Sequence, residues 1–411
     1  MSAASSWVIG GYQTDFARNT AREGKEFSDL FAETVQHTLQ AAQIDAADVG
    51  VIHVGNAFGQ LFTGQGQLGG MPATVAPELW GVPSMRHEAA CASGSMALIA
   101  AMAEIEAGRY DVALVIGAEI EKTVNGELGA QHLGAAAWIG HEGETAQFMW
   151  PHMFDLLANE YDRRYGLDDQ YMHGIAELNV RNARVNPNAQ TRDWSYTPES
   201  FTNDEEANPS VEGRIRRTDC SAMTDGAAGI VVVSDRYLAD HPQVKARPKA
   251  KILGWGHRTV GLSLQQKLDR SADKEYVLPH VRQTILDAFG RAGVASVDDI
   301  DSIETHDCFS MSEYAAIDHF GITAPGDSWK AVDSGDLELG GRIPVNPSGG
   351  LIGGGHPVGA TGVRMVLDSY KQVTGQAGAY QVAGAKKVAT LNIGGSTTTS
   401  ASFVVGAGEE D

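Results

Sequence analysis

Residues 346–362 read NPSGGLIGGGHPVGATG and form the most informative segment of the chain. Three consecutive glycines precede His356 and Pro357 follows it, so the backbone can approach a ligand closely where the imidazole emerges. The next residues, ATGVRMVLDSY, predict a helix that starts behind this loop. A phosphate loop is not indicated, because the Gly-Lys-Ser/Thr ending is absent and the glycine spacing does not open a dinucleotide-binding unit. A plain glycine turn with a surface histidine remains the alternative.

Two parts of the chain repeat the same order of features. Residues 41–58 (AAQIDAADVGVIHVGNAF) and 291–309 (RAGVASVDDIDSIETHDCF) each combine a helix end, an acidic turn, an alternating strand and a loop that ends in Phe. Each is followed by a glycine-rich loop, a helix and a strand ending in glycine, which is βαβ-like wiring. Val- and Ile-rich runs at 111–120 and 229–235 predict strands buried on both faces. We therefore expect an α/β protein built from two related halves.

The region between the halves has a different character. Many His, Trp, Met, Arg and Asn residues but few buried-strand runs predict an inserted segment of helices and loops, a common place for ligand contacts. The expected domains are residues 1–120 as the N-terminal half, completed by about 221–250, residues 121–220 as the inserted loop domain, and residues 251–411 as the C-terminal half.

The composition limits the class of protein. The chain has 411 residues, 43% hydrophobic and 20% charged, which is ordinary for a folded globular protein. Its formal net charge of −21 argues against nucleic acid or an anionic membrane as the general partner, so any anionic ligand needs a local basic pocket. No apolar run reaches the roughly 18 to 20 residues that span a bilayer, and the N-terminal residues lack a charged leader before an apolar stretch. A cytoplasmic location is therefore expected.

Three cysteines stand at wide spacings: Cys91, Cys220 and Cys308. An odd number so spaced is not typical of a disulfide framework or a zinc site, and we predict no metal. Cys91 lies among small residues just before a predicted helix, whose N-terminus would favour the thiolate and lower the thiol pKa. A small buried hydrophobe among alanines is an equally good interpretation of this stretch alone.

The segment THDCF (305–309) follows a predicted strand. In extended backbone His306 and Cys308 point to the same side and Asp307 to the opposite side, an arrangement that suits proton transfer. Packing of the strand end into a core is the alternative. Cys220 has no comparable histidine neighbour in the sequence and is interpreted as structural or incidental.

Four segments occur in the order CASG, HDCF, NPSGGLIGGGHPVGATG and LNIGG over the whole chain, and with them the sequence resembles the thiolase family. The resemblance implies the thiolase fold, with two similar βαβ-rich halves in a layered α/β arrangement and an inserted loop domain. It implies that Cys91 takes an acyl group from coenzyme A, and that His356 activates this thiol and helps bind the thioester oxygen.

The chain departs from most thiolases at two places. Most carry NEAF where this chain has HDCF, and CxG where it has Asn392-Ile393-Gly394. The sterol-carrier-protein-type and archaeal-type thiolases share HDCF, and the resemblance to them implies that Cys308 is the general acid/base. His306 would then replace the usual Asn of one oxyanion site, and Gly394 would supply a backbone N–H for a second oxyanion site. Asn392 would shape the loop.

The resemblance extends into the insertion, where the segment beginning PHM implies His152 and Met153 near the pantetheine of coenzyme A. Arg216 or Arg217 in EGRIRRTD could meet the phosphates, although a solvated charge run is a close alternative. Coenzyme A and acyl-CoA are expected as substrates, with no permanently bound cofactor, and a homodimer or homotetramer is expected. The predicted activity is that of an acyl-CoA C-acyltransferase. The alternatives are a condensing or aldolase-type relative with an OB-fold zinc-ribbon partner, and a non-catalytic acyl-CoA or lipid-binding homologue.

Overall fold

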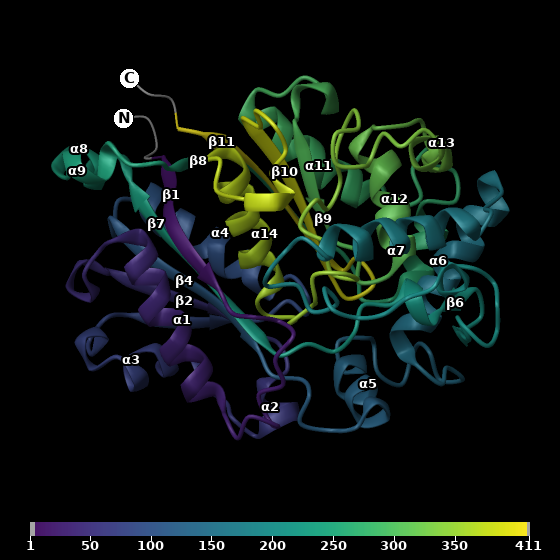
Figure 1. Cartoon of the computed structure of the whole chain (residues 1–411), viewed down its shortest axis with the longest axis horizontal. Helices are drawn as coiled ribbons and strands as arrows, with labels where there is room; N and C mark the ends of the chain where they lie inside the picture. The colour runs from purple at the N-terminus through teal and green to yellow at the C-terminus, as the bar shows by residue number, and fades with distance from the viewer. Residues whose placement is uncertain (1–4, 409–411) are drawn as a thin grey trace.

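One nine-stranded sheet organises the protein, whose computed structural model describes residues 5–408 (Figure 1). The strand order is β3-β2-β4-β7-β1-β8-β11-β10-β9. The strands are β1 (Ser6–Gln13), β2 (Val51–Gly55), β3 (Ser84–His87), β4 (Val112–Glu119), β7 (Gly226–Ser234), β8 (Ala250–Thr259), β9 (Ser302–Thr305), β10 (Lys387–Gly394) and β11 (Thr399–Ala407). Strands β4 and β7 are buried along their whole length, as their Val- and Ile-rich runs predict.

The sheet consists of two halves with the same wiring. They meet where β1 pairs with β8 over only two residue pairs. Outward from this junction lie β7, β4, β2 and β3 on one side, and β11, β10 and β9 on the other. In the second half a parallel bridge from Ile303 to Val345 takes the place that β3 has in the first. The α/β class with two similar βαβ-rich halves is therefore confirmed.

Four helices complete the layers of the two halves. Helices α1 (Phe27–Ala42) and α11 (Pro279–Ala292) cover the outer faces, while α4 (Ser93–Glu106) and α14 (Thr361–Val373) pack against each other between the halves. Glycines bring the first turns of α4 and α14 together, because a Cβ at Gly94 would press on the carbonyl oxygen of Gly359. Cys91 and His356 stand just before these two helices, so this close approach brings them together.

The segment between β4 and β7 lies mainly against the second half. It contains α5 (Gly126–Gly134), α6 (Met149–Tyr165), α7 (Gln170–Ala183) and the two-stranded sheet of β5 (Ser210–Glu212) and β6 (Ile215–Arg216). Helices α6 and α7 pack on α12 (Ser310–Phe320), which follows the HDCF segment. We propose the domain limits 120, 220 and 250 on this basis; residues 1–4 and 409–411 of the terminal domains lie outside the described part.

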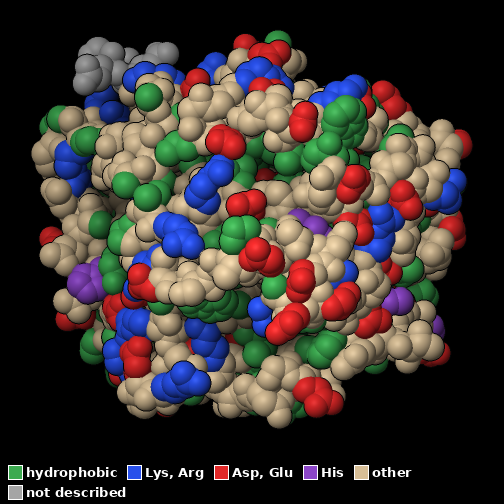
Figure 2. Space-filling view, turned by 45° about the vertical axis from the view of Figure 1, so that its right-hand side comes forward, with side chains coloured by type: hydrophobic (Ala, Val, Ile, Leu, Met, Phe, Trp, Pro, Cys, Tyr) green, Lys and Arg blue, Asp and Glu red, His purple; other side chains and the backbone are tan. Residues whose placement is uncertain are grey.

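The remaining helices are short: α2 (Gly59–Thr63), α3 (Met71–Val75), α8 (Asp235–Asp240), α9 (Pro242–Lys245), α10 (Leu264–Arg270) and α13 (Ser328–Asp333). Within residues 5–408, no helix is both long enough and apolar enough to cross a membrane. The face in Figure 2 intersperses Lys and Arg with Asp and Glu. Basic side chains are therefore present on this face despite the net charge of −21.

Candidate active site

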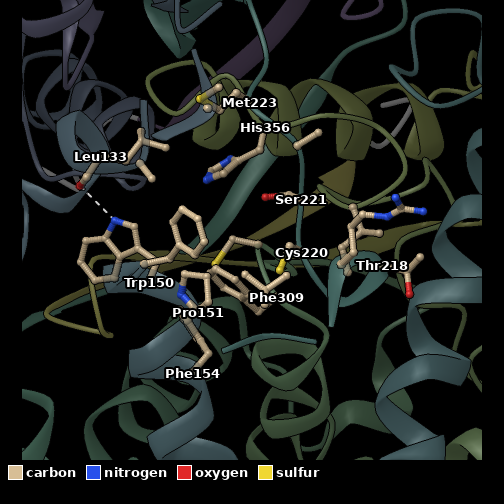
Figure 3. A pocket seen from close by; sticks show the side chains of 18 of the residues that line it. Leu133, Trp150, Pro151, Phe154, Thr218, Cys220, Ser221, Met223, Phe309 and His356 are labelled. Carbon is tan, nitrogen blue, oxygen red and sulfur yellow. Dashed lines mark hydrogen bonds between the residues drawn. The ribbon is translucent and has the colours of Figure 1, made fainter. Parts of the chain in front are cut away.

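All three cysteines line one cavity of about 820 Å³. Its wall comes from the turn before α4, the HDCF loop after β9, the glycine loop before α14, the turn after β10 and the insertion. The lining is largely aromatic and aliphatic, with Phe58, Phe148, Trp150, Phe154, Phe309 and Ile352. In Figure 3 the His356 imidazole projects into this cavity from the side opposite Phe309 and Phe154. Polar and nucleophilic groups thus converge in an otherwise apolar site, which is typical of a binding or catalytic pocket.

Cys91 stands in a tight turn between β3 and α4. Ala90 has a φ of 49°, in the left-handed region that residues with a Cβ rarely adopt. The Ser93 hydroxyl stabilises the turn by accepting from the Ala89 amide (2.9 Å) and donating to the Ala90 carbonyl (2.6 Å). The backbone amides of Gly395 and of Cys91 itself favour the Cys91 thiolate and act to lower its pKa. The strained residue, Ala90, therefore directly precedes Cys91, whose side chain lines the cavity.

The thiol of Cys91 is neutral in the ligand-free site. Burial, and after it the nearby Glu121 carboxyl, raise its pKa to about 12. The expectation that the helix N-terminus lowers this pKa is wrong, because desolvation of the thiolate outweighs the amides that favour it. A base beside the sulfur is therefore needed to make it a nucleophile.

His356 has the protonation pattern of such a base. The Thr361 hydroxyl lies 2.7 Å from His356 Nδ1 and 3.1 Å from the Pro357 carbonyl. With its own proton donated to this carbonyl, the hydroxyl accepts the Nδ1 proton. That leaves Nε2 without a proton, and Nε2 is buried with no hydrogen-bond partner among the described residues. Burial, with a smaller effect of the Arg364 charge, lowers the His356 pKa to about 3, so the ring is neutral.

His306 is held in the opposite tautomer. Asn392 accepts from the Ser95 hydroxyl (2.7 Å), and its amide nitrogen donates to the Cys91 carbonyl (3.0 Å) and to His306 Nδ1 (3.1 Å). His306 Nε2 therefore carries the proton. Burial, and next the His356 ring, lower its pKa well below the usual value. With these tautomers, His356 Nε2 is an acceptor and His306 Nε2 is a donor.

Cys91, His306 and His356 lie together, each offering one atom within 4.8 Å of the others. The two rings meet edge to face, with centroids 5.1 Å apart. These residue types also bind zinc, but a metal ligand must offer a lone pair, and Nε2 of His306 carries a proton in the observed hydrogen-bond pattern. The arrangement suits proton transfer and stabilisation of an oxyanion.

Cys308 is buried and lines the same cavity. Burial, and after it the Cys91 side chain, raise the Cys308 pKa well above its usual value. Asp307 points away from the cavity, as expected, and accepts from the amides of Leu351 (2.6 Å) and Ile352 (3.0 Å). The HDCF loop thus presents its thiol to the cavity and anchors the glycine loop with its carboxylate.

The structure corrects one expected contact. Gly394 ends the β10–β11 ladder opposite Thr399, where a Cβ would overlap the Ala89 carbonyl oxygen. The amide that reaches the Cys91 sulfur belongs to the next residue, Gly395, which has a φ of 62° and lines the cavity. In LNIGG, Gly394 therefore allows close packing and Gly395 supplies the amide donor.

The expected coenzyme A contacts are only partly at the cavity. His152 lies 3.5 Å from a Glu212 carboxylate oxygen and Met153 is in the core. Helix α6 presents other residues to the cavity: Met149, Trp150, Pro151 and Phe154. Arg216 is paired with Glu205 (2.9 Å), whereas Arg217 lines the cavity.

Sequence reasoning missed the segment from Cys220 to Thr224. Cys220 lines the cavity, and its backbone forms an isolated antiparallel β-bridge with Phe309. The Ser221 amide donates to the Cys308 carbonyl (2.9 Å). The Thr224 hydroxyl accepts from the His356 amide (2.9 Å). This segment therefore joins the thiol loop to the histidine loop. The sequence feature that could have revealed this segment is Cys220 itself.

Two buried carboxyls after β4 were also missed. Glu119 accepts from the amides of Ala57 (2.9 Å) and Gly359 (3.1 Å), and Glu121 accepts from Val358 (3.0 Å). Burial raises the pKa of Glu119 to about 7 and that of Glu121 well above its usual value. They brace the glycine loop, and the only signal for them is an acidic pair at the end of a buried strand.

Two family models match the chain: the N-terminal thiolase domain over residues 6–191 and the C-terminal thiolase-like domain over residues 264–407. The chain belongs to the thiolase family. Acetyl-CoA acetyltransferase of Methanothermobacter thermautotrophicus is 31% identical over 96% of this chain and 97% of its own length. Sterol carrier protein 2 of Homo sapiens is 28% identical over 94% of this chain and 69% of its own length.

Two solved structures share the fold. An Ltp2–ChsH2(DUF35) aldolase superposes with a TM-score of 0.77, at 18% identity and with 100% of both chains covered. Acetyl-CoA acetyltransferase from Syntrophomonas wolfei superposes with a TM-score of 0.67, at 16% identity, covering 98% of this chain and 99% of that chain. At these identities the likeness concerns the fold alone.

Proposed function

We propose that the protein is an acyl-CoA C-acyltransferase that cleaves 3-ketoacyl-CoA with coenzyme A, or runs the reverse condensation, through an acyl group on Cys91. The observation that carries the proposal is the buried Nε2 of His356, which has no hydrogen-bond partner among residues 5–408 and belongs to a residue clustered with the Cys91 thiol. A buried acceptor with no partner costs free energy, and such groups are found where a reaction uses them.

In the first step, His356 Nε2 takes the Cys91 proton as the sulfur attacks C3 of the substrate. Because the thiol pKa lies above that of the imidazole, the proton stays on sulfur until a substrate oxygen is bound. The amides of Gly395 and Cys91 are the donors for the oxygen that becomes negative on the attacked carbon.

In the second part, the C2–C3 bond breaks and the departing acetyl-CoA enolate takes a proton. We assign the Nε2–H of His306 to the enolate oxygen and Cys308 to proton donation, since His306 lies in the cluster with Cys91 and Cys308 lines the cavity. The Cys308 thiolate then accepts the thiol proton of an incoming coenzyme A, whose sulfur removes the acyl group from Cys91. The Cys91 thiolate leaves and recovers its proton from His356. Condensation follows the same steps in reverse.

The lining of the cavity supports a proposed position for coenzyme A. Trp194, Tyr196 and Arg217 all line it, and the charges of Arg217 and Arg184 act on the Tyr196 hydroxyl. We place the phosphates beside Arg217, with the pantetheine running inward to Cys91. A cavity of about 820 Å³ with aromatic walls has room beyond an acetyl group, so we propose a longer or bulkier acyl chain.

An aldolase-type reaction with an OB-fold zinc-ribbon partner is the second candidate, favoured by the full-length fold match to the Ltp2–ChsH2(DUF35) aldolase. A homo-oligomer, a cytoplasmic location and a non-catalytic acyl-CoA-binding role remain untested predictions. Labelling with acyl-CoA distinguishes these roles, because only the acyltransferase forms an acyl thioester on the protein.

The test is incubation with acyl-CoA followed by peptide mass mapping, and a thiolysis screen of 3-ketoacyl-CoAs of graded length. We expect the adduct on Cys91. We also expect His356→Ala to fold yet lose turnover by about a hundredfold or more, as for an acid/base group. An adduct on Cys220 or Cys308 with Cys91 unmodified, or near-normal turnover of folded His356→Ala, would contradict the proposal.

A further inference from the structure

A buried cation supports the turn from Gly395 to Thr398 that joins β10 to β11. Lys267, in α10, has its ammonium within 3.0 Å of four oxygens. The Ser396 carbonyl lies at 2.6 Å, the Ser396 hydroxyl at 2.9 Å, and the Leu262 carbonyl and Thr398 hydroxyl at 3.0 Å. Three of these four oxygens belong to the turn, so Lys267 connects a helix of the second half to the end of the active-site strand.

A second side chain holds the residue between these anchors. His280 Nε2 lies 3.0 Å from the Thr397 carbonyl and 3.1 Å from its hydroxyl. Because a carbonyl only accepts, Nε2 carries the proton. Thr397 has a φ of 64°, an outlier for a β-branched residue that costs on the order of 1–3 kcal/mol. The contacts of Lys267 and His280 offset this cost.

Lys267 is expensive to bury for a purely structural contact. Its side chain is 7% exposed, and among residues 5–408 no carboxylate oxygen lies within 4.0 Å of the ammonium. Burial lowers its pKa to about 7, with Glu142 acting in the opposite direction. A buried charge without an ionic partner is unfavourable, and such groups cluster at functional sites.

The turn matters because its first residue supplies a donor to the site. Gly394 is fixed in the β10–β11 ladder, and the residues after Gly395 are tied to Lys267 and His280. Gly395 alone lies between these constraints, in the left-handed conformation that directs its amide to the Cys91 sulfur. Movement of the turn would change the direction of that amide.

We propose that Lys267, assisted by His280, is a positioning residue that aims the Gly395 amide at the oxygen of the acyl group on Cys91. The proposal rests on the proposed acyl transfer. Lys267 touches neither the substrate nor Cys91, and it acts through the turn.

The test compares two reactions of Cys91 in the full-length protein. Alkylation by iodoacetamide needs the thiol but no oxyanion, whereas acylation by acyl-CoA needs both. We expect Lys267→Met to keep alkylation within about twofold of wild type and to lower acylation about 10- to 100-fold, with a fall in kcat and little change in KM. Lys330→Met, at an exposed lysine paired with Asp327, is the matched control and should change neither rate.

His280→Leu removes the second tether without removing a charge and should show the same selective loss, so it decides the question if Lys267→Met does not fold. Equal acylation by wild type and a folded variant, or acylation and alkylation that fall in the same proportion, would overturn the inference. Absence of any acyl adduct on wild-type Cys91 would instead count against the proposed function, which separates the two failures.

Discussion

Thr361→Val removes the acceptor that sets the tautomer of His356 while nearly preserving side-chain volume. In the wild type, the Thr361 hydroxyl lies 2.7 Å from Nδ1 and is buried beneath the glycine loop. Without it, the Nδ1 proton has no acceptor at that position, at a cost of about 1–3 kcal/mol for an unsatisfied buried donor. With the proton on Nε2, which is also buried without a partner among the described residues, Nδ1 needs no acceptor, so the variant loses the preference for the tautomer with a free Nε2.

The expected consequence follows from this free energy. A penalty of about 1–3 kcal/mol shifts the ratio of the two tautomers by about 5- to 150-fold against the one with a free Nε2. Acylation of Cys91 requires this tautomer, so its rate should fall by up to that factor. Iodoacetamide alkylation at high pH, where hydroxide removes the thiol proton, should change by less than about twofold.

The assay is rapid-quench acylation at saturating acyl-CoA, with nitrogen NMR of the histidine ring to report the tautomer. Thr361→Ser is the matched control because it keeps the hydroxyl, and it should retain most of the rate. A folded Thr361→Val protein that acylates within twofold of wild type would show that the Thr361 hydroxyl does not set the state of His356.

The other predictions concern the second thiol and the cavity entrance. Cys308→Ala and Cys308→Ser should both accept an acyl group at Cys91 but fail at the steps that move a proton to or from carbon; near-normal thiolysis and condensation by the serine variant would show that Cys308 only packs. Asn392→Ala removes a hydrogen bond but no titratable group and should cost less turnover than Cys308→Ala; a larger loss would contradict this role. Arg217→Ala should raise KM for coenzyme A several-fold with kcat little changed, whereas Arg216→Ala, which removes an arginine already paired with Glu205, should not; equal effects would refute the proposed phosphate contact.

The sequence was sufficient for the fold and for the inner site because these depend on local patterns. Buried Val- and Ile-rich runs predict the strands, and their repeated order predicts the two halves. The residues after parallel strands of a half lie at the same edge of the sheet, and the close approach of α4 and α14 joins the two halves, so Cys91, His306 and His356 meet although they are far apart in the chain.

The outer site was less predictable because it depends on packing. Position in the sequence places His152 and Met153 in the right helix, but the fit of α6 against the second half turns Trp150 and Phe154 toward the cavity instead. The raised pKa of Cys91 also depends on packing. A sequence indicates a helix N-terminus, yet the depth of burial that raises the pKa depends on the assembled walls.

The position of the second thiol follows from the pairing of two strands. Strand β10 runs parallel to β9 with Leu391 opposite Thr305, so Asn392 in β10 and His306 just after β9 lie side by side and are joined by a hydrogen bond of 3.1 Å. A cysteine at position 392 has no N–H of comparable strength to offer His306 Nδ1, and the thiol at 308 enters the cavity from the adjacent strand end. The choice of residue at position 392 therefore affects both His306 and the position at which a thiol can serve, which is 308 in this chain. Returning a thiol to position 392 alone would leave the His306 tautomer without its donor, so a proton carrier can move between these strand ends only together with the group that holds the histidine.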